Sequence, residues 1–184
     1  LSCDDLLMMD VFAGTKSMAM SAQAMFRTWG VSVDQNADFS PDVLAEFTRW
    51  NYCRYWLEHL RFVDREMKQM VWLPLHIHFS PSCTTFSCGS AWLSGRSQGS
   101  PYADAYATGI AFNADQCIHD MVFLIMLLRR YGAVTTFTIE NPASSLVWRL
   151  LDSIMGADLG GVLDSESVDY CMYSDWGYRK GNRF

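Results

Sequence analysis

The chain has 184 residues, of which 50% are hydrophobic and 18% are charged. This composition provides enough apolar surface for a folded core and excludes a disordered polar chain, and the length suits a single domain. The net charge of −6 argues against a broadly basic surface for nucleic acids, although a local basic patch is present at residues 178–183.

The cysteine pattern indicates a reducing compartment. Six cysteines are present and none forms a C-x-x-C pair, so the pattern does not indicate a small disulfide scaffold. No secretory signal is recognisable, and the apolar run at residues 121–128 is shorter than the ~18 residues that cross a membrane. We therefore expect an intracellular protein, cytoplasmic or nuclear, that does not bind membranes. The start at Leu1 rather than at a methionine favours a fragment or a trimmed chain.

The N-terminal third predicts two strands, each followed by a helix. The first helix contains Met, Ala and Gln, which favour helices, with Ser17 as its cap and Gly30 as its end. Pro41 suits the first turn of the second helix. The strands are expected at residues 6–12 and 31–33, and the helices at residues 17–29 and 41–61.

The rest of the chain continues the alternation. A Gly- and Ser-rich stretch at residues 87–106 reads as a long loop, which in a compact domain is usually functional or mobile. A weak strand signal lies near residues 70–72. Alternating strands and helices imply a mainly parallel sheet, and therefore an α/β fold. Further strands are expected at residues 75–79, 133–139 and 167–173, and helices at residues 113–130 and 142–155.

Small residues follow the first predicted strand, in Phe12-Ala13-Gly14-Thr15. Such a turn lets a ligand approach the backbone at the start of a helix. Asp34 comes twenty positions after Gly14, the usual offset of an acidic residue that binds ribose hydroxyls. The complete G-x-G-x-x-G pattern is absent, so an ordinary strand–helix turn is the alternative.

Two further strand ends carry reactive groups. Cys83 follows the predicted strand at residues 75–79, within a polar turn that argues against core packing. A nucleophilic thiol needs exposure and a lowered pKa, and we expect a following helix N-terminus to lower it. Glu140 and Asn141 follow the strand at residues 133–139, where the alternative role is a solvated turn or helix cap. Because parallel strands end at one edge, we expect Gly14, Asp34, Cys83 and Glu140 to line one cleft.

Together these segments resemble the DNA cytosine-5 methyltransferases, especially the short phage-type members. Phe12-Ala13-Gly14 is similar to their cofactor turn, and Ser80-Pro81-Ser82-Cys83 with Phe86-Ser87 to their Pro-Cys nucleophile loop. Glu140-Asn141 is similar to their Glu-Asn motif. The motif order matches, and the resemblance covers about residues 6 to 180. It implies a Rossmann-like class I methyltransferase fold with helices on both faces of the sheet, formed by one domain over residues 1–184 that lacks a target-recognition domain. In a viral protein the compartment would be that of the host.

The resemblance also implies roles for individual residues. Cys83 would add to carbon 6 of a cytosine that has left the DNA stack. Glu140 would hold or protonate ring nitrogen 3, and Asn141 would position the loop. S-adenosylmethionine would donate the methyl group. The implied cofactor-binding residues are Phe12, Ala13, Gly14, Thr15, Ser17, Asp34, Gln35 and Pro81, and the implied DNA-binding residues are Ser87, Arg179 and Lys180.

Departures from the family pattern keep other interpretations open. Lys16 stands where the family often has a second glycine, and Ser82 replaces the usual second proline. A degenerate or truncated copy, acting as an inactive binding module, is therefore the main alternative. A methyltransferase for another substrate is a third interpretation. His76 and His78 share a strand face and, with Cys117 and His119, are weak metal candidates, because no zinc spacing is present. Packing in the sheet is the simpler role for the two strand histidines, and we expect no metal.

Overall fold

The structure is a computed structural model that describes residues 7–14, 17–25, 29–47, 75–90, 94–104, 109–130, 135–156, 167–169 and 181–183. The chain forms two compact units, and each unit consists of two segments that are separate in the sequence. The first unit comprises Leu1–Phe79 and Phe123–Thr138, and the second comprises Ser80–Val122 and Ile139–Phe184.

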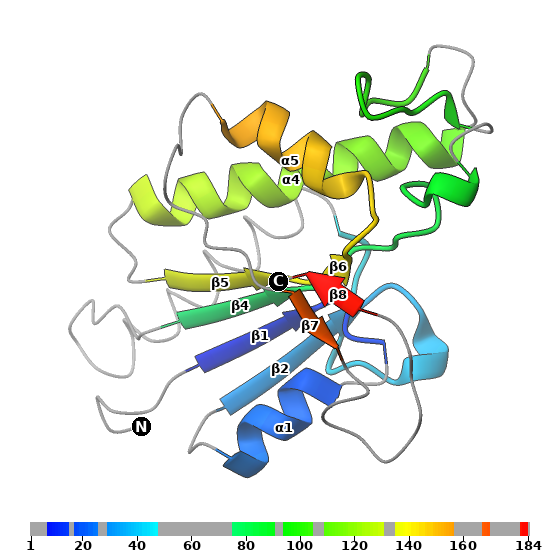
Figure 1. Cartoon of the computed structure of the whole chain (residues 1–184). Helices are drawn as coiled ribbons and strands as arrows, with labels where there is room; N and C mark the ends of the chain where they lie inside the picture. Colours follow the sequence, from blue (N-terminus) through cyan, green and yellow to red (C-terminus); the bar gives the residue numbers. More distant parts are fainter. Residues whose placement is uncertain are drawn as a thin grey trace. The chain divides into compact units, whose positions relative to one another are not determined.

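A five-stranded parallel sheet forms the centre of the first unit (Figure 1). The strand order is β3-β2-β1-β4-β5, and the central strand β1 pairs in parallel with both β2 and β4. Met9, Val11, Ile77 and Phe79 lie on one face of β1 and β4 and are almost fully buried. Met8, Asp10 and His78 on the other face are buried as well, as expected for strands covered on both faces. The strands span Leu7–Val11 (β1), Trp29–Asp34 (β2), Val43–Leu44 (β3), Leu75–Phe79 (β4) and Thr135–Ile139 (β5).

This strand order reverses direction between β1 and β4. The chain first moves outward from β1 to β2 and β3, and then returns to β4 on the other side of β1. Right-handed crossovers on either side of such a reversal put the connecting helices on opposite faces. Figure 1 shows helix α1 (Ser17–Met25) on one face and the C-terminal part of helix α4 (Gly109–Arg130) over the other. The predicted α/β class with a parallel sheet is thus confirmed.

Helix α1 ends earlier than predicted. We expected it to reach residue 29 and to stop at Gly30, but Trp29 and Gly30 belong to β2 and pair with β1. Gly30 has a packing role instead, because a Cβ atom there would lie 3.1 Å from the Ala19 carbonyl oxygen and 3.3 Å from the Ala19 Cβ. The glycine therefore lets α1 approach the sheet closely, which is a tertiary effect that the local pattern does not reveal.

The helix predicted to start at Pro41 is wrong over the described residues. Residues 43–44 form the edge strand β3. The Asp42 carboxylate, next to Pro41, accepts hydrogen bonds from the Ser32 backbone N–H (2.8 Å) and hydroxyl (2.6 Å). Ala45 N–H donates to the Asp34 carbonyl. These bonds hold residues 42–45 against β2. The rest of the predicted helix, residues 48–61, and the weak strand near 70–72 lie outside the described residues.

The second unit contains most of α4, helix α5 (Val147–Met155) and a small antiparallel sheet. The predicted helix at residues 113–130 is confirmed as α4, which starts earlier, at Gly109. The helix predicted at residues 142–155 is α5, which starts five residues later than predicted, at Val147. Pro142 lies in a strand instead. The strand order of this sheet is β6-β8-β7. Of its three strands only β7 was predicted, as the strand at residues 167–173, and the structure describes the first three residues of that range. Its strands span Asn141–Pro142 (β6), Ser167–Asp169 (β7) and Gly181–Arg183 (β8).

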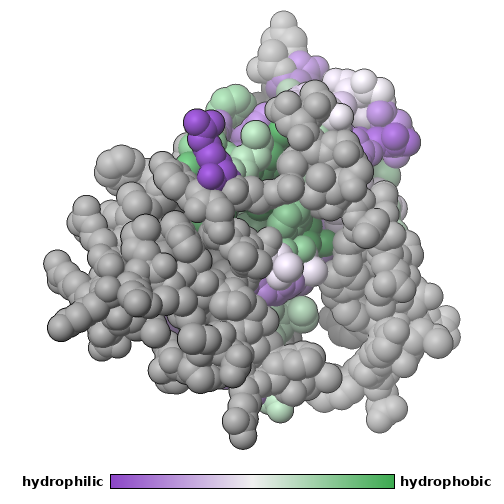
Figure 2. Space-filling view, turned by 90° about the vertical axis from the view of Figure 1, so that its left-hand side faces the viewer, coloured by the Kyte–Doolittle hydropathy of each residue, from purple (hydrophilic) through white to green (hydrophobic). Residues whose placement is uncertain are grey.

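Helix α4 contains a longer apolar stretch than the sequence led us to expect. Its stretch Gly109–Leu128 is long and apolar enough, by length and composition alone, to cross a membrane. This stretch is not an uninterrupted apolar run in the sequence, because polar residues such as Asp115 and Asp120 divide it. Core helices of globular proteins have the same composition, and 44% of this stretch is buried. Figure 2 shows that the described residues on the visible face include both hydrophobic and strongly hydrophilic ones.

Candidate functional site

The turn after β1 is tightly fixed to the end of β2. The backbone N–H groups of Phe12 and Ala13 both donate to the Val33 carbonyl, at 3.0 and 3.2 Å. Gly14 N–H donates to Asp34 Oδ2 at 3.0 Å, and the other Asp34 oxygen accepts from Asn36 N–H at 2.8 Å. The twenty-residue offset between Gly14 and Asp34 therefore corresponds to a direct contact.

Two residues of this turn have left-handed backbone conformations. Gly14 has φ +48°, which costs a glycine little, whereas Phe12 has φ +62°, which is rare for a side chain of its size. The Phe12 ring packs against Phe47 with ring centroids 5.0 Å apart, and Phe47 packs edge-on against Phe79 at 6.1 Å. This aromatic cluster and the bonds to Val33 hold Phe12 in its unusual conformation, which is a feature often found at ligand sites.

Asp10 is a buried acid beneath this turn that our sequence analysis did not single out. It lies on β1, is 2% exposed, and its carboxylate accepts from Ala19 N–H in α1 at 3.1 Å. Burial raises the pKa of Asp10 to about 6, the Ala19 bond acts against this, and the negative charge of Asp34 adds to it. The sequence does contain a signal for this residue, because Asp10 is the one acidic residue within the apolar run at residues 6–12.

Replacing Asp10 by asparagine should change how stability depends on pH. The folded-state pKa near 6 lies above the unfolded value of 3.8, so the native protein holds this proton more tightly. The free energy of unfolding should therefore fall as pH rises from about 4 to 6, by up to about 3 kcal/mol. Asp10→Asn cannot ionise and keeps an acceptor for Ala19. Urea unfolding measures the free energy of unfolding of both proteins at pH 4.5 and at pH 7.5. The value for Asp10→Asn minus the value for the wild type should be about 1–3 kcal/mol larger at pH 7.5 than at pH 4.5. An equal difference at both pH values would contradict the assignment.

In the second unit, Cys83 lies in an exposed turn just beyond β4. Phe86 N–H donates to the Cys83 carbonyl at 3.0 Å, and Ser82 Oγ lies 3.0 Å from Thr84 Oγ1. Phe86 is 1% exposed and anchors the turn. The described residues that follow form the short 3-10 helix η2 (Cys88–Ser90). The α-helix N-terminus that we expected next to Cys83 is therefore not found in residues 84–90.

Asn141 connects the segments that follow β4 and β5. Its side-chain amide donates to the Pro81 carbonyl at 2.8 Å, and the residue is 1% exposed. We call this bond the Asn141 clamp. It fixes the chain two residues before Cys83 to the chain one residue after Glu140, which is half-buried. The other amide atom, Oδ1, is buried and has no hydrogen-bond partner among the described residues.

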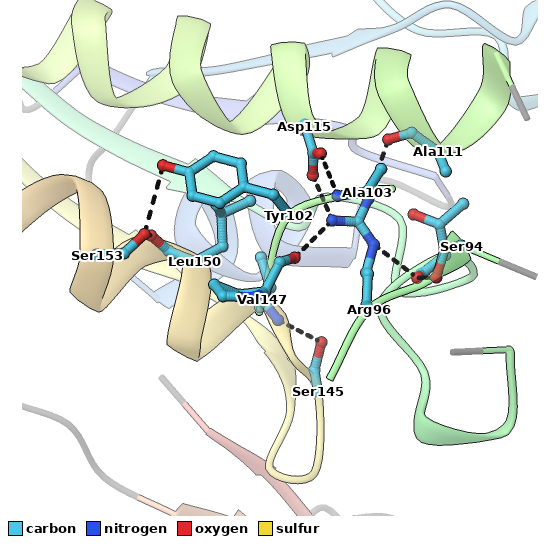
Figure 3. Close-up of polar contacts among 12 residues, drawn as sticks. Ser94, Arg96, Tyr102, Ala103, Ala111, Asp115, Ser145, Val147, Leu150 and Ser153 are labelled. Atoms are coloured by element: carbon cyan, nitrogen blue, oxygen red, sulfur yellow. Dashed lines mark hydrogen bonds and ion pairs between the residues drawn. The ribbon is translucent and has the colours of Figure 1, made fainter. Parts of the chain in front are cut away.

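Arg96 binds the segment that follows Cys83, and Figure 3 shows its contacts with Ala111 and Asp115. The side chain is buried and its guanidinium lies over the Phe86 ring, 4.1 Å from the centroid. It donates to the Thr85 carbonyl at 3.1 Å, to the Pro101 carbonyl at 2.7 Å and to the Ala111 carbonyl at 2.9 Å. It also forms an ion pair with Asp115, whose second oxygen accepts from Ala103 N–H at 2.8 Å. Arg96 thus ties the Cys83 turn, the loop at 94–104 and α4 together.

The strand histidines pack among threonines of β5. His76 Nδ1 lies 3.0 Å from Thr136 Oγ1, and His78 Nδ1 lies 2.8 Å from Thr138 Oγ1. Burial lowers the pKa of His78 to about 4, with a smaller effect from His76. Burial likewise raises the pKa of the Cys117 thiol to about 12. Among the residues that the structure describes, no cluster of three or more His, Cys, Asp or Glu side chains is arranged to hold a metal ion.

The remaining predicted site residues are placed less fully. Ser17 begins α1 and Gln35 is exposed next to Asp34. Ser87 is exposed, and its hydroxyl accepts from Gly89 N–H at 3.2 Å. Thr15, Arg179 and Lys180 lie outside the described residues. Gly14 and Asp34 belong to the first unit, and Cys83 and Glu140 to the second, so their joint cleft stays a prediction.

The sequence matches no protein-family model, and no match was found among curated proteins or solved structures. The described residues define an α/β protein with a parallel sheet, a turn after β1 that is bonded to Val33 and Asp34, and a clamped, exposed cysteine turn after β4.

Proposed function

We propose that this chain carries the catalytic part of an S-adenosylmethionine-dependent methyltransferase that modifies carbon 5 of cytosine in DNA. The Asn141 clamp is the observation that carries the proposal. It brings the segment containing Glu140 to the segment containing Cys83, which supplies an exposed thiol and a carboxyl group from neighbouring strand ends. Addition of a nucleophile to a pyrimidine ring needs these two groups.

The residues have defined tasks in such a reaction. The Cys83 thiolate forms a carbon–sulfur bond at carbon 6 of the cytosine, while Glu140 delivers a proton to ring nitrogen 3. The electrons of the 5,6 double bond then make carbon 5 nucleophilic, and S-adenosylmethionine, when bound, would supply the methyl group and leave as the neutral thioether. Loss of the carbon-5 proton to a base restores the double bond and expels Cys83 as thiolate, and ring nitrogen 3 returns its proton to Glu140. Because Cys83 must approach the face of the ring, the cytosine has to leave the base stack first.

The turn after β1 has the chemistry to accept this cofactor. The backbone N–H groups of its described residues, Phe12, Ala13 and Gly14, already donate to Val33 and Asp34. Over residues 12–14 the turn therefore offers no free donor of the kind with which dinucleotide sites cradle a pyrophosphate. The adjacent Asp34 carboxylate is half-exposed, and such an acceptor suits ribose hydroxyls and a cationic sulfonium group.

Removing the Asp34 carboxylate should weaken cofactor binding. We expect Asp34→Ala to reduce the affinity for S-adenosylmethionine by about 1–3 kcal/mol, because the ribose hydroxyls lose their acceptor and Gly14 N–H loses its partner. Calorimetry measures this directly. Asp38→Ala is the matched control, since Asp38 is exposed, lies four residues away and changes the charge equally. Unchanged affinity in Asp34→Ala would remove Asp34 from the site.

Covalent trapping tests the reaction itself. DNA that contains 5-fluorocytosine should form a stable adduct with the wild-type chain when S-adenosylmethionine is present, because fluorine cannot leave as the carbon-5 proton does. Mass spectrometry of the digested adduct should locate it at Cys83. A folded chain that binds the cofactor and DNA without forming the adduct would instead be the inactive binding module.

A further inference from the structure

A polar surface cavity of about 430 Å³ lies in the second unit, at the start of α5. Its volume is in the range of small-molecule sites, about 300–1,000 Å³. Its wall is formed by Gln98, by the small residues at positions 143–145, and by Trp148, Arg149 and Asp152 on α5. None of these side chains belongs to the Asn141 clamp or to the Arg96 ion pair.

Three kinds of recognition group meet in this cavity. Trp148 is half-buried and its indole N–H donates to the Pro142 carbonyl at 3.0 Å, which fixes the ring. Arg149 is exposed and donates through Nε to Gln98 Oε1 at 3.1 Å. Among the described residues, no acceptor is bonded to the two Nη atoms of Arg149. Asp152 lies one turn farther along α5, on the same side of the helix, without an ion pair to Arg149 in the described part of the chain.

This combination fits a nucleobase better than a phosphate. A phosphate would gain from Arg149 but would be repelled by the Asp152 carboxylate in the same wall. Guanine uses both residues, because its O6 and N7 atoms accept from an arginine fork and its N1 and N2 hydrogens can donate to a carboxylate. An indole provides the stacking surface that proteins use for unpaired bases.

The cavity also borders the segment that follows the Cys83 turn. Cys88 Sγ lies 3.4 Å from the carbonyl oxygen of Ser144, a cavity residue, and Cys88 is five residues after Cys83. A DNA strand whose cytosine reaches Cys83 would therefore run close to the cavity. We propose that this cavity binds a guanine base of single-stranded or locally unpaired DNA near the target cytosine, an inference whose placement rests on the proposed function.

The test compares guanine recognition with general affinity for DNA. Fluorescence anisotropy, without S-adenosylmethionine, measures binding of a single-stranded 12-mer with one guanine next to its cytosine. A second 12-mer carries 7-deazaguanine, which lacks the N7 acceptor. The wild type should bind the guanine strand about 10-fold more tightly, as bidentate arginine contacts imply, and Arg149→Ala should abolish this difference. Asp152→Ala should leave this difference in place, because 7-deazaguanine keeps the N1 and N2 hydrogens that donate to the carboxylate.

Arg130→Ala is the control for charge, because Arg130 is exposed on α4 and does not line the cavity. It should weaken both strands equally. Equal weakening of both strands by Arg149→Ala, or a wild type without guanine preference, would overturn the inference. Guanine preference without an adduct at Cys83 would leave the cavity assignment standing and reject the methyltransferase. An adduct without guanine preference would do the reverse.

Discussion

Replacing Cys83 by serine should abolish covalent trapping of 5-fluorocytosine DNA. A serine hydroxyl is un-ionised at neutral pH and is a far weaker nucleophile than a thiol, so the bond to carbon 6 would not form. We expect a loss of at least 10³-fold in the rate of adduct formation. Gel separation of the protein–DNA adduct under denaturing conditions measures this rate.

Cys88 provides the internal control, because it is also exposed and lies in the same segment. It lies five residues beyond Cys83, away from the clamped Pro81. Cys88→Ser should therefore trap DNA at the wild-type rate. Trapping that survives Cys83→Ser, or an adduct located at Cys88, would refute the assignment of the nucleophile.

Removing the Arg96 guanidinium should produce the largest loss of stability. Arg96→Met keeps an unbranched side chain at this position but leaves the Asp115 carboxylate with Ala103 N–H as its one donor among the described residues. The carbonyls of Thr85, Pro101 and Ala111 each lose a charged donor as well. Breaking a buried ion pair by removing one partner costs about 3–5 kcal/mol. Urea unfolding should show a loss of this size.

Two variants separate the ion pair from general effects of mutation. Arg130→Met changes an exposed arginine and should alter the free energy of unfolding by less than about 0.5 kcal/mol. Adding Asp115→Asn to Arg96→Met should restore part of the lost stability, because no uncompensated carboxylate then remains buried. Reaction of Cys83 with a thiol reagent should accelerate in Arg96→Met, since its turn loses an anchor. A loss below about 1 kcal/mol would mean that the network contributes little.

Three strands of the parallel sheet could be predicted from their residue types. β1 and β4 are rich in apolar residues and β5 is rich in β-branched ones, and polar or small residues follow each of them. The errors came from positions that tertiary contacts decide. Gly30 looks like a helix end, but it lets α1 pack closely on β2. Asp42 looks like a helix-start acid, but it binds Ser32 across the sheet edge.

The candidate site was predictable to a similar extent. Cys83, Glu140 and Asn141 stand at strand ends, where ligands bind in open α/β sheets, and this much is visible in the sequence. The partner of Asn141 is sixty residues away, and no local pattern connects the two. Arg96 lies in a Gly- and Ser-rich stretch that reads as exposed. Its burial depends on Asp115, nineteen residues later, so only the folded chain reveals it.

The proline after Asn141 bears on the chemical ageing of the clamp. Asparagine side chains deamidate when the backbone nitrogen of the next residue attacks them and closes a succinimide ring. The nitrogen of Pro142 carries no hydrogen, and Asn141 is 1% exposed to water. The amide that donates to Pro81 is thereby shielded from slow conversion to a carboxylate, which could not donate that bond. Long storage of the protein should leave Asn141 intact while exposed asparagines elsewhere in the chain are lost.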